Sequence, residues 1–154
     1  MKLIDFYMEK LGLDYEATKC DVDYPKYSNL SSTIMLMNVS GRSFDEVFQH
    51  QLKLSGELKC LPNDHEKIIK PILKSYGFKK IKKIKERSIG EFLFNHKEGE
   101  FVVASKKHIE YYKDGIRYIQ PLDEKTRLDL DEWLLSSILL VYRKEESDAE
   151  QQEE

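Results

Sequence analysis

Two β-prone runs on either side of an Asp-Gly pair place the strongest constraint on how this chain can fold. The runs are His108–Tyr112 and Ile116–Ile119, and Asp114-Gly115 lies between them. Asp-Gly readily takes the left-handed backbone conformation that a tight two-residue turn requires, and such turns join antiparallel strands. Another short apolar run, Phe101–Ala104, precedes the pair. The sequence therefore predicts an antiparallel sheet in its second half.

The part of the chain before these runs has helical patterns instead. Ile34–Val39 forms an apolar stretch that Ser31 or Asn29 can cap. Ser43 and Glu46 have the spacing of a capping box, and apolar residues follow at helical intervals. Residues 63–76 predict a third helix, in which Pro71 indicates a kink or a break. Helices followed by an antiparallel sheet predict an α+β domain with the N-terminal helices packed on the sheet.

Shorter segments complete the expected layout. We expect a short helix over residues 2–10, an extended loop over 12–29, a strand over 78–85 and a short helix from Ser88 through Phe94. Residues 126–137 look helical at first. Periodicity alone cannot decide whether Ile138–Tyr142 is a helix or a buried strand. No boundary divides residues 1–144, so we expect a single domain.

Charge is unevenly distributed along the chain, although the net charge is only -3. Residues 145–154 hold six acids and no base, which predicts a disordered acidic tail. From Lys67 to Arg87 there are nine Lys or Arg and one acid, Glu86. Lysines of this kind protect an edge strand from pairing with other chains. The alternative is nucleic-acid binding, with a binding site at Lys79, Lys80, Lys82 and Lys83.

Several classes of function lack support in the sequence. Cys20 and Cys60 have no metal-ligand spacing and are expected to be free thiols. His50, His65 and His96 lie in different expected elements and are interpreted as surface histidines. These Cys and His spacings give no reason to expect a metal site. No glycine-rich nucleotide loop is present, so we expect no nucleotide cofactor or any other cofactor. No apolar run approaches the roughly 18 residues that span a bilayer, and the first residues carry acids where a signal peptide would be basic.

Five motifs, taken in order, resemble the small papain-like cysteine peptidases of phages and mobile elements. The first is SSTIMLMNVSGRSFDEVF, which is similar to the family's helix, glycine turn and second helix. The others are Gly77-Phe78, the segment SIGEF from Ser88, the segment GEFVV from Gly99, and His108 followed by Asp114-Gly115. The resemblance covers about residues 28–118 and implies a papain-like fold.

The resemblance also implies where a catalytic site would lie. Counting back from Gly41, the position of the family's nucleophilic Cys falls on Ser31, give or take one residue, and His108 matches the catalytic His. The third catalytic position falls on Ile119, or on Asp131 in a rival alignment. A Cys at a helix start beside a His gains a lowered pKa, whereas a Ser hydroxyl needs a base within hydrogen-bond reach.

These observations lead to one expected function and two alternatives. We expect a catalytically inactive papain-like protein that binds a protein partner or a second copy of itself. It would act as a structural component, for example of a bacteriophage, in the cytoplasm or a virion. The first alternative is an active hydrolase that uses Ser31 or Ser32 with His108 and Asp131. The second is a nucleic-acid-binding protein that uses the lysines named above.

Overall fold

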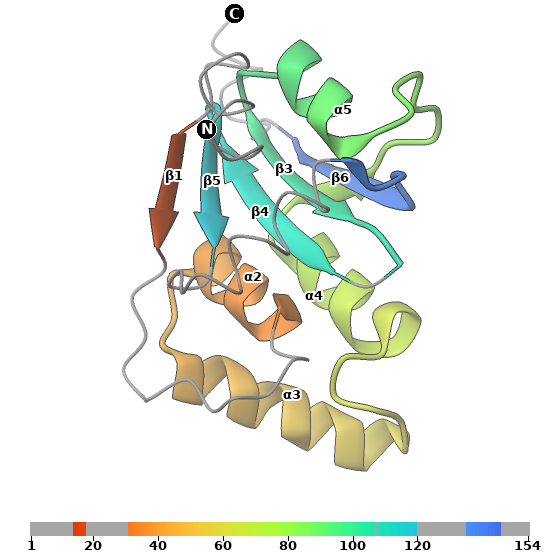
Figure 1. Cartoon of the computed structure of the whole chain (residues 1–154). Helices are drawn as coiled ribbons and strands as arrows, with labels where there is room; N and C mark the ends of the chain where they lie inside the picture. The colour runs from red at the N-terminus through yellow and green to blue at the C-terminus, as the bar shows by residue number, and fades with distance from the viewer. Residues whose placement is uncertain (1–13, 18–30, 107, 120–134, 146–154) are drawn as a thin grey trace, which may run out of the picture.

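A computed structural model describes residues 14–17, 31–106, 108–119 and 135–145 of the chain. The strands form one sheet, and helices pack on both of its faces (Figure 1), which confirms the predicted α+β fold. In chain order the elements are β1 (Asp14–Ala17), α2 (Ser31–Ser40), α3 (Phe44–Leu58), the π-helix η1 (His65–Ile69), α4 (Lys70–Ser75), β2 (Phe78–Lys80), α5 (Ile89–Asn95), β3 (Glu100–Ala104), β4 (Ile109–Lys113), β5 (Ile116–Ile119) and β6 (Leu140–Lys144).

The sheet has the strand order β1-β5-β4-β3-β6-β2. Neighbouring strands are antiparallel, except that β1 pairs with β5 in parallel. The turn between β4 and β5 is the predicted one: Asp114 and Gly115 both have positive φ angles, 50° and 81°. This left-handed backbone is what the Asp-Gly pair supplies at low cost. The predicted antiparallel hairpin is confirmed.

Two segments differ from the elements predicted from the sequence, and a third resolves a choice between helix and strand that the sequence left open. The expected loop over 12–29 was wrong at Asp14–Ala17, which is a strand because it pairs with β5. The expected strand over 78–85 is shorter than predicted and ends at Lys80, which pairs with Tyr142 of β6. Ile81 still donates its N–H to Val141 O at 2.9 Å. The open choice at 138–142 resolves to strand β6. The expected helices at 2–10 and 126–137 fall on residues outside the described ones, apart from 135–137.

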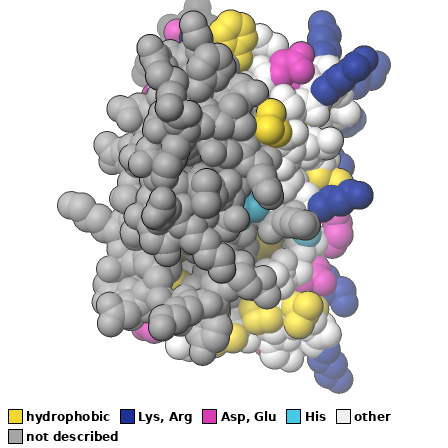
Figure 2. Space-filling view, in the orientation of Figure 1, with side chains coloured by type: hydrophobic (Ala, Val, Ile, Leu, Met, Phe, Trp, Pro, Cys, Tyr) yellow, Lys and Arg dark blue, Asp and Glu magenta, His cyan; other side chains and the backbone are white. Residues whose placement is uncertain are grey.

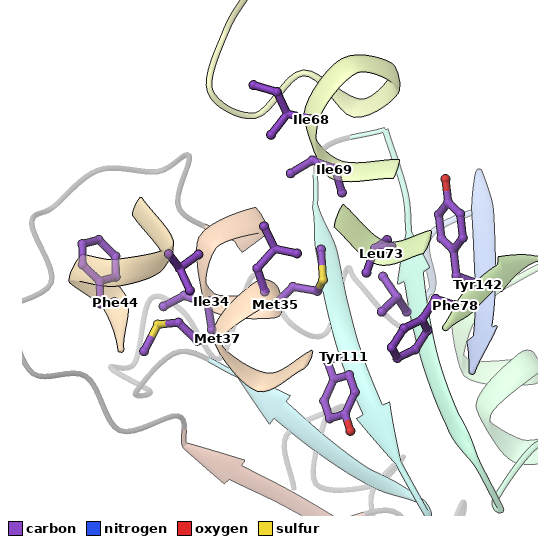
Figure 3. Packing of buried hydrophobic residues seen from close by; sticks show 13 residues of the cluster. Ile34, Met35, Met37, Phe44, Ile68, Ile69, Leu73, Phe78, Tyr111 and Tyr142 are labelled. Carbon is purple, nitrogen blue, oxygen red and sulfur yellow. The ribbon is translucent and has the colours of Figure 1, made fainter. Parts of the chain in front are cut away.

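Two hydrophobic cores lie on opposite faces of the sheet. On one face, side chains of α2, α3, η1 and α4 pack against Val102 of β3 and Tyr111 of β4. Figure 3 shows side chains such as Met35 and Leu73 pointing from these helices toward the strands. On the other face, α5 packs against Phe101 and its neighbours in β3, β4 and β6. We call these the α2 face and the α5 face.

Local sequence signals explain where the helices begin and break. Ser43 accepts a hydrogen bond from the N–H of Glu46 at 3.2 Å, so Ser43 is the N-cap of α3, and its hydroxyl also donates to Oε1 of Glu46 at 3.2 Å. Ser88 caps α5 in the same way. Pro71 lies at the start of α4, directly after η1. A proline has no N–H to donate, so it is tolerated at this first turn, where the π-helix gives way to an α-helix while Ile69 and Lys70 keep helical backbone angles.

His65 connects η1 to the sheet and is not the surface histidine that its sequence position indicated. Its Nε2 lies 2.6 Å from the hydroxyl of Tyr142 in β6, and the side chain is half-buried. Burial lowers the pKa of His65 below 6.5, and burial also raises the pKa of Tyr142 to about 12. Both groups are therefore neutral when they pair near pH 7.

The lowered pKa of His65 predicts a specific pH dependence of stability. Above pH 6.5 the contribution of the neutral ring is fully present, and it is lost as the pH falls from 6.5 through the native pKa. In His65→Gln, the deficit in the free energy of unfolding relative to the native chain should shrink between pH 7.5 and 5.5, as measured by urea denaturation. The exposed His50→Gln is the control and should show no such change. A deficit for His65→Gln that is constant with pH would contradict the assignment.

Candidate functional site

His108 precedes β4, and its ring is held by a buried carboxylate two residues further along. Nε2 of His108 lies 3.1 Å from Oε2 of Glu110, with the His108 side chain 32% exposed and that of Glu110 3% exposed. Residues i and i+2 of an extended chain point to the same side, so the residue before β4 meets the second residue of β4. A carboxylate on Nε2 fixes the orientation of the ring.

Arg117 of β5 neutralises Glu110 on the same face of the sheet. Its Nη2 donates to both carboxylate oxygens of Glu110, at 3.0 and 3.1 Å, and its Nε donates at 3.3 Å. The hydroxyl of Tyr112 also donates to Glu110 at 3.3 Å. Burial acts to raise the pKa of Glu110, but Arg117 and His108 outweigh it, and the pKa lies below its ordinary value. Glu110 is therefore ionised at neutral pH although it is fully buried.

The two candidate nucleophiles lie at the start of α2, where a different network forms. Ser31 is the first residue of the helix and is half-buried. Ser32 is 6% exposed, and its Oγ accepts a hydrogen bond from Nε2 of Gln51 in α3 at 3.4 Å. Gln51 also accepts a 2.7 Å bond from Thr33 and donates to the carbonyl of Pro62 at 3.1 Å. Ser32 thus belongs to the buried contact between α2 and α3.

Ser32 and the candidate base His108 are engaged by separate networks. Helix α2 packs on the face that carries Tyr111, whereas Glu110, which holds His108, pairs with Val103 and lies on the α5 face. The structure thus brings His108 to Glu110, and Ser32 to Gln51. A nucleophile and its base need a separation of about 2.6–3.2 Å. Asp131 lies outside the described residues, and of Ile119 only the backbone pairing with Ala17 is described.

The lysines predicted from sequence gather at one edge of the sheet. Lys79 and Lys80 are exposed on β2, the last strand in the sheet order, and Lys82 and Lys83 are exposed in the segment that follows. Figure 2 shows lysine and arginine side chains projecting from the side of the molecule on which β6 and α4 lie. Their position supports the interpretation that they protect an edge strand.

Other kinds of site find no support in the described part of the chain. It contains no group of three or more side chains that could hold a metal ion. None of its helices combines the length and the apolar character that crossing a bilayer needs. Cys60 is a free, half-buried thiol, and Cys20 is not among the described residues. A hollow between α2, α3 and α4 is lined by Ser40, Arg42 and His50, at the opposite end of α2 from Ser31.

Two residues that matter here were missed in the sequence analysis. Glu110 was not singled out, although its i+2 spacing from His108 within a predicted strand was a usable signal. Gln51 lies in a predicted helix, and nothing in the sequence indicates that it contacts Ser32. His96 is at the surface as expected, with its side chain 38% exposed, and its Nε2 contacts Glu86 at 3.1 Å while its ring stacks on Phe92.

The comparisons with known proteins give no relative for this chain: no family model matches it, and neither a curated protein nor a solved structure matches it.

The ion pair between Glu110 and Arg117 predicts that removing one of its two charges greatly lowers the free energy of unfolding. Glu110→Gln leaves the guanidinium of Arg117 buried without a countercharge, and removal of one partner of a buried pair costs about 3–5 kcal/mol. We expect this loss in the free energy of unfolding, measured by urea denaturation. The exposed Glu98→Gln should change it by less than about 0.5 kcal/mol.

A double variant separates the charge effect from loss of packing. Glu110→Leu with Arg117→Met removes both charges together and should recover most of the stability, since apolar replacements of a buried pair are often neutral. If the double variant were as unstable as Glu110→Gln, the countercharge explanation would be wrong.

Proposed function

We propose that this chain is a catalytically inactive protein of papain-like fold that acts as a protein-binding or structural component. The α+β architecture and the ordered motifs around Ser31, Gly41 and His108 support the papain-like part of the proposal. It is a resemblance in pattern, and a fold alone does not carry its function with it.

One observation carries the inactive part of the proposal. The hydroxyl of Ser32 is buried and bonded to Gln51, while the ring of His108 is bonded to Glu110 on the α5 face. Loss of the nucleophile from a catalytic unit costs about 10⁶-fold in rate in a serine protease. A serine hydroxyl stays protonated at neutral pH and needs a base within hydrogen-bond reach to attack, whereas an amide such as that of Gln51 cannot take up its proton.

Exposed leucines favour a role in binding. Leu58 at the end of α3 and Leu61 in the loop after it are 44% and 71% exposed. Contiguous exposed apolar patches mark surfaces where partners bind, and Leu58 and Leu61 lie three positions apart in the chain. The partner is another protein or a second copy of this chain, and the setting is the cytoplasm or a virion such as that of a bacteriophage.

Serine-directed labelling tests whether the chain is inactive. We expect a fluorophosphonate probe to leave the intact protein unlabelled at neutral pH, because the hydroxyl of Ser32 is bonded to an amide and the ring of His108 contacts Glu110. A labelled trypsin sample run in parallel confirms the reactivity of the probe. Labelling that disappears in Ser31→Ala and in His108→Ala would overturn the proposal and establish the hydrolase alternative.

A cysteine placed at the position of the expected nucleophile measures whether His108 can reach it. In Ser31→Cys, with Cys20 and Cys60 replaced by Ser, the start of α2 should lower the thiol pKa below about 8.5. The pKa is read from the pH dependence of iodoacetamide alkylation. Ser40→Cys at the other end of α2 is the matched control and should not be lowered.

The decisive comparison adds His108→Ala to Ser31→Cys. We expect the thiol pKa to stay unchanged, because the ring of His108 is held by Glu110. A rise of the pKa in the double variant would show that the imidazole acts on this position, and the catalytic arrangement would then be intact.

A further inference from the structure

Strand β2 forms an outer edge of the sheet, and its exposed side is basic. It is the last strand in the sheet order, and its Lys79 and Lys80 are exposed. The chain continues past β2 with Lys82, Lys83 and Lys85, which are also exposed. We call these five lysines the basic edge.

The acidic segment of the sequence starts next to the basic edge. Glu145 follows β6 directly, and its N–H donates to the carbonyl of Gly77 at 3.0 Å. Its carboxylate Oε1 lies 3.6 Å from Nζ of Lys79. These two contacts attach the beginning of the segment to the beginning of β2. The next nine residues, 146–154, lie outside the described ones and carry no base and five more acids: Glu146, Asp148, Glu150, Glu153 and Glu154.

The length of the segment is sufficient to follow the basic edge. Nine residues span at most about 30 Å when extended, at 3.3–3.6 Å per residue. The six-residue step from Lys79 to Lys85 spans at most about 22 Å by the same measure. The acids after Glu145 can therefore reach each lysine of the basic edge.

Attachment at Glu145 makes the weak individual contacts effective together. A single exposed ion pair contributes about 0–1 kcal/mol. A segment tethered beside its binding surface, however, has an effective concentration in the millimolar range, so the pairs form within one molecule and act jointly. Such exposed pairs weaken with salt, because the screening length falls to about 3 Å at 1 M.

We propose that the acidic segment 146–154 docks on the basic edge of the same chain and competes there with other polyanions. The contact between Glu145 and Lys79 is the first of these ion pairs. The docked segment also shields β2 from pairing with another sheet edge. This inference does not depend on the proposed papain-like function, because it uses only the edge strand, its charges and the contacts of Glu145.

The test compares two full-length variants of equal net charge. The first carries Glu146→Gln, Asp148→Asn and Glu150→Gln in the acidic segment. The matched control carries Asp45→Asn, Glu57→Gln and Glu98→Gln, which are exposed acids away from the basic edge. The probe is a heparin oligosaccharide of defined length, titrated at 50 mM salt. We expect the segment variant to bind about tenfold more tightly than the control, as for a typical coupling between two sites, and the difference to vanish at 0.5 M salt.

Two further measurements establish where the segment docks. The amide chemical shifts of Lys79 to Lys85 should change in the segment variant without any probe, and should stay in place in the control variant. When Lys79, Lys80, Lys82 and Lys83 are replaced by Gln, the segment variant and the control should bind heparin equally. Equal affinity in the native lysine background, or a difference that survives loss of the lysines, would overturn the proposal.

Discussion

Strands β3 and β4 are covered by helices on both faces of the sheet, so their central side chains must all find partners inside the protein. Phe101 and Val103 point to α5, while Val102 and Tyr111 point to α2 and α4. Because successive side chains of a strand point to opposite faces of the sheet, each of these strands contributes to both hydrophobic cores. At about 25 cal/mol for each Å² of apolar surface removed from water, these two layers provide most of the stabilisation that positions the remaining elements.

The same constraint explains the cluster around Glu110. A charged residue in the middle of a strand that is buried on both faces needs a countercharge within reach, and Arg117 of the neighbouring strand supplies it through two donors. One guanidinium nitrogen, Nη1, has no hydrogen-bond partner among the described residues. A buried pair contributes little net stability and much specificity of arrangement. In this chain it fixes how β4 pairs with β5 and how His108 is oriented.

What could be predicted from the sequence was mostly local. The Asp114-Gly115 turn and the helix caps at Ser43 and Ser88 each depend on a few adjacent residues, and they are confirmed. Contacts between segments that are distant in the sequence could not be predicted. Arg117 meets Glu110 only through strand pairing, Gln51 meets Ser32 only through packing of α3 on α2, and β1 is a strand only because β5 lies beside it.

In the candidate site, too, local features could be predicted from the sequence and contacts between distant segments could not. The sequence indicated the start of α2 and the histidine before β4 as the positions to inspect, because both lie at element boundaries that local patterns define. It could not indicate the face on which the histidine's carboxylate lies, since this depends on strand register and not on motif order. The catalytic equivalence of Ser31, His108 and Asp131 therefore remains a prediction, whereas exposure of the four lysines at and just after β2 is confirmed.

The parallel pairing of β1 with β5 has a consequence for the order of folding. Asp14 pairs with Ile116, which lies 102 positions later (116 − 14), whereas β3, β4 and β5 are joined by short connections. Closing a long loop costs chain entropy before any contact forms, so the central hairpins form first and β1 adds to an existing sheet edge. Amide protons of β1 should then exchange with solvent by detachment of this one strand, without global unfolding.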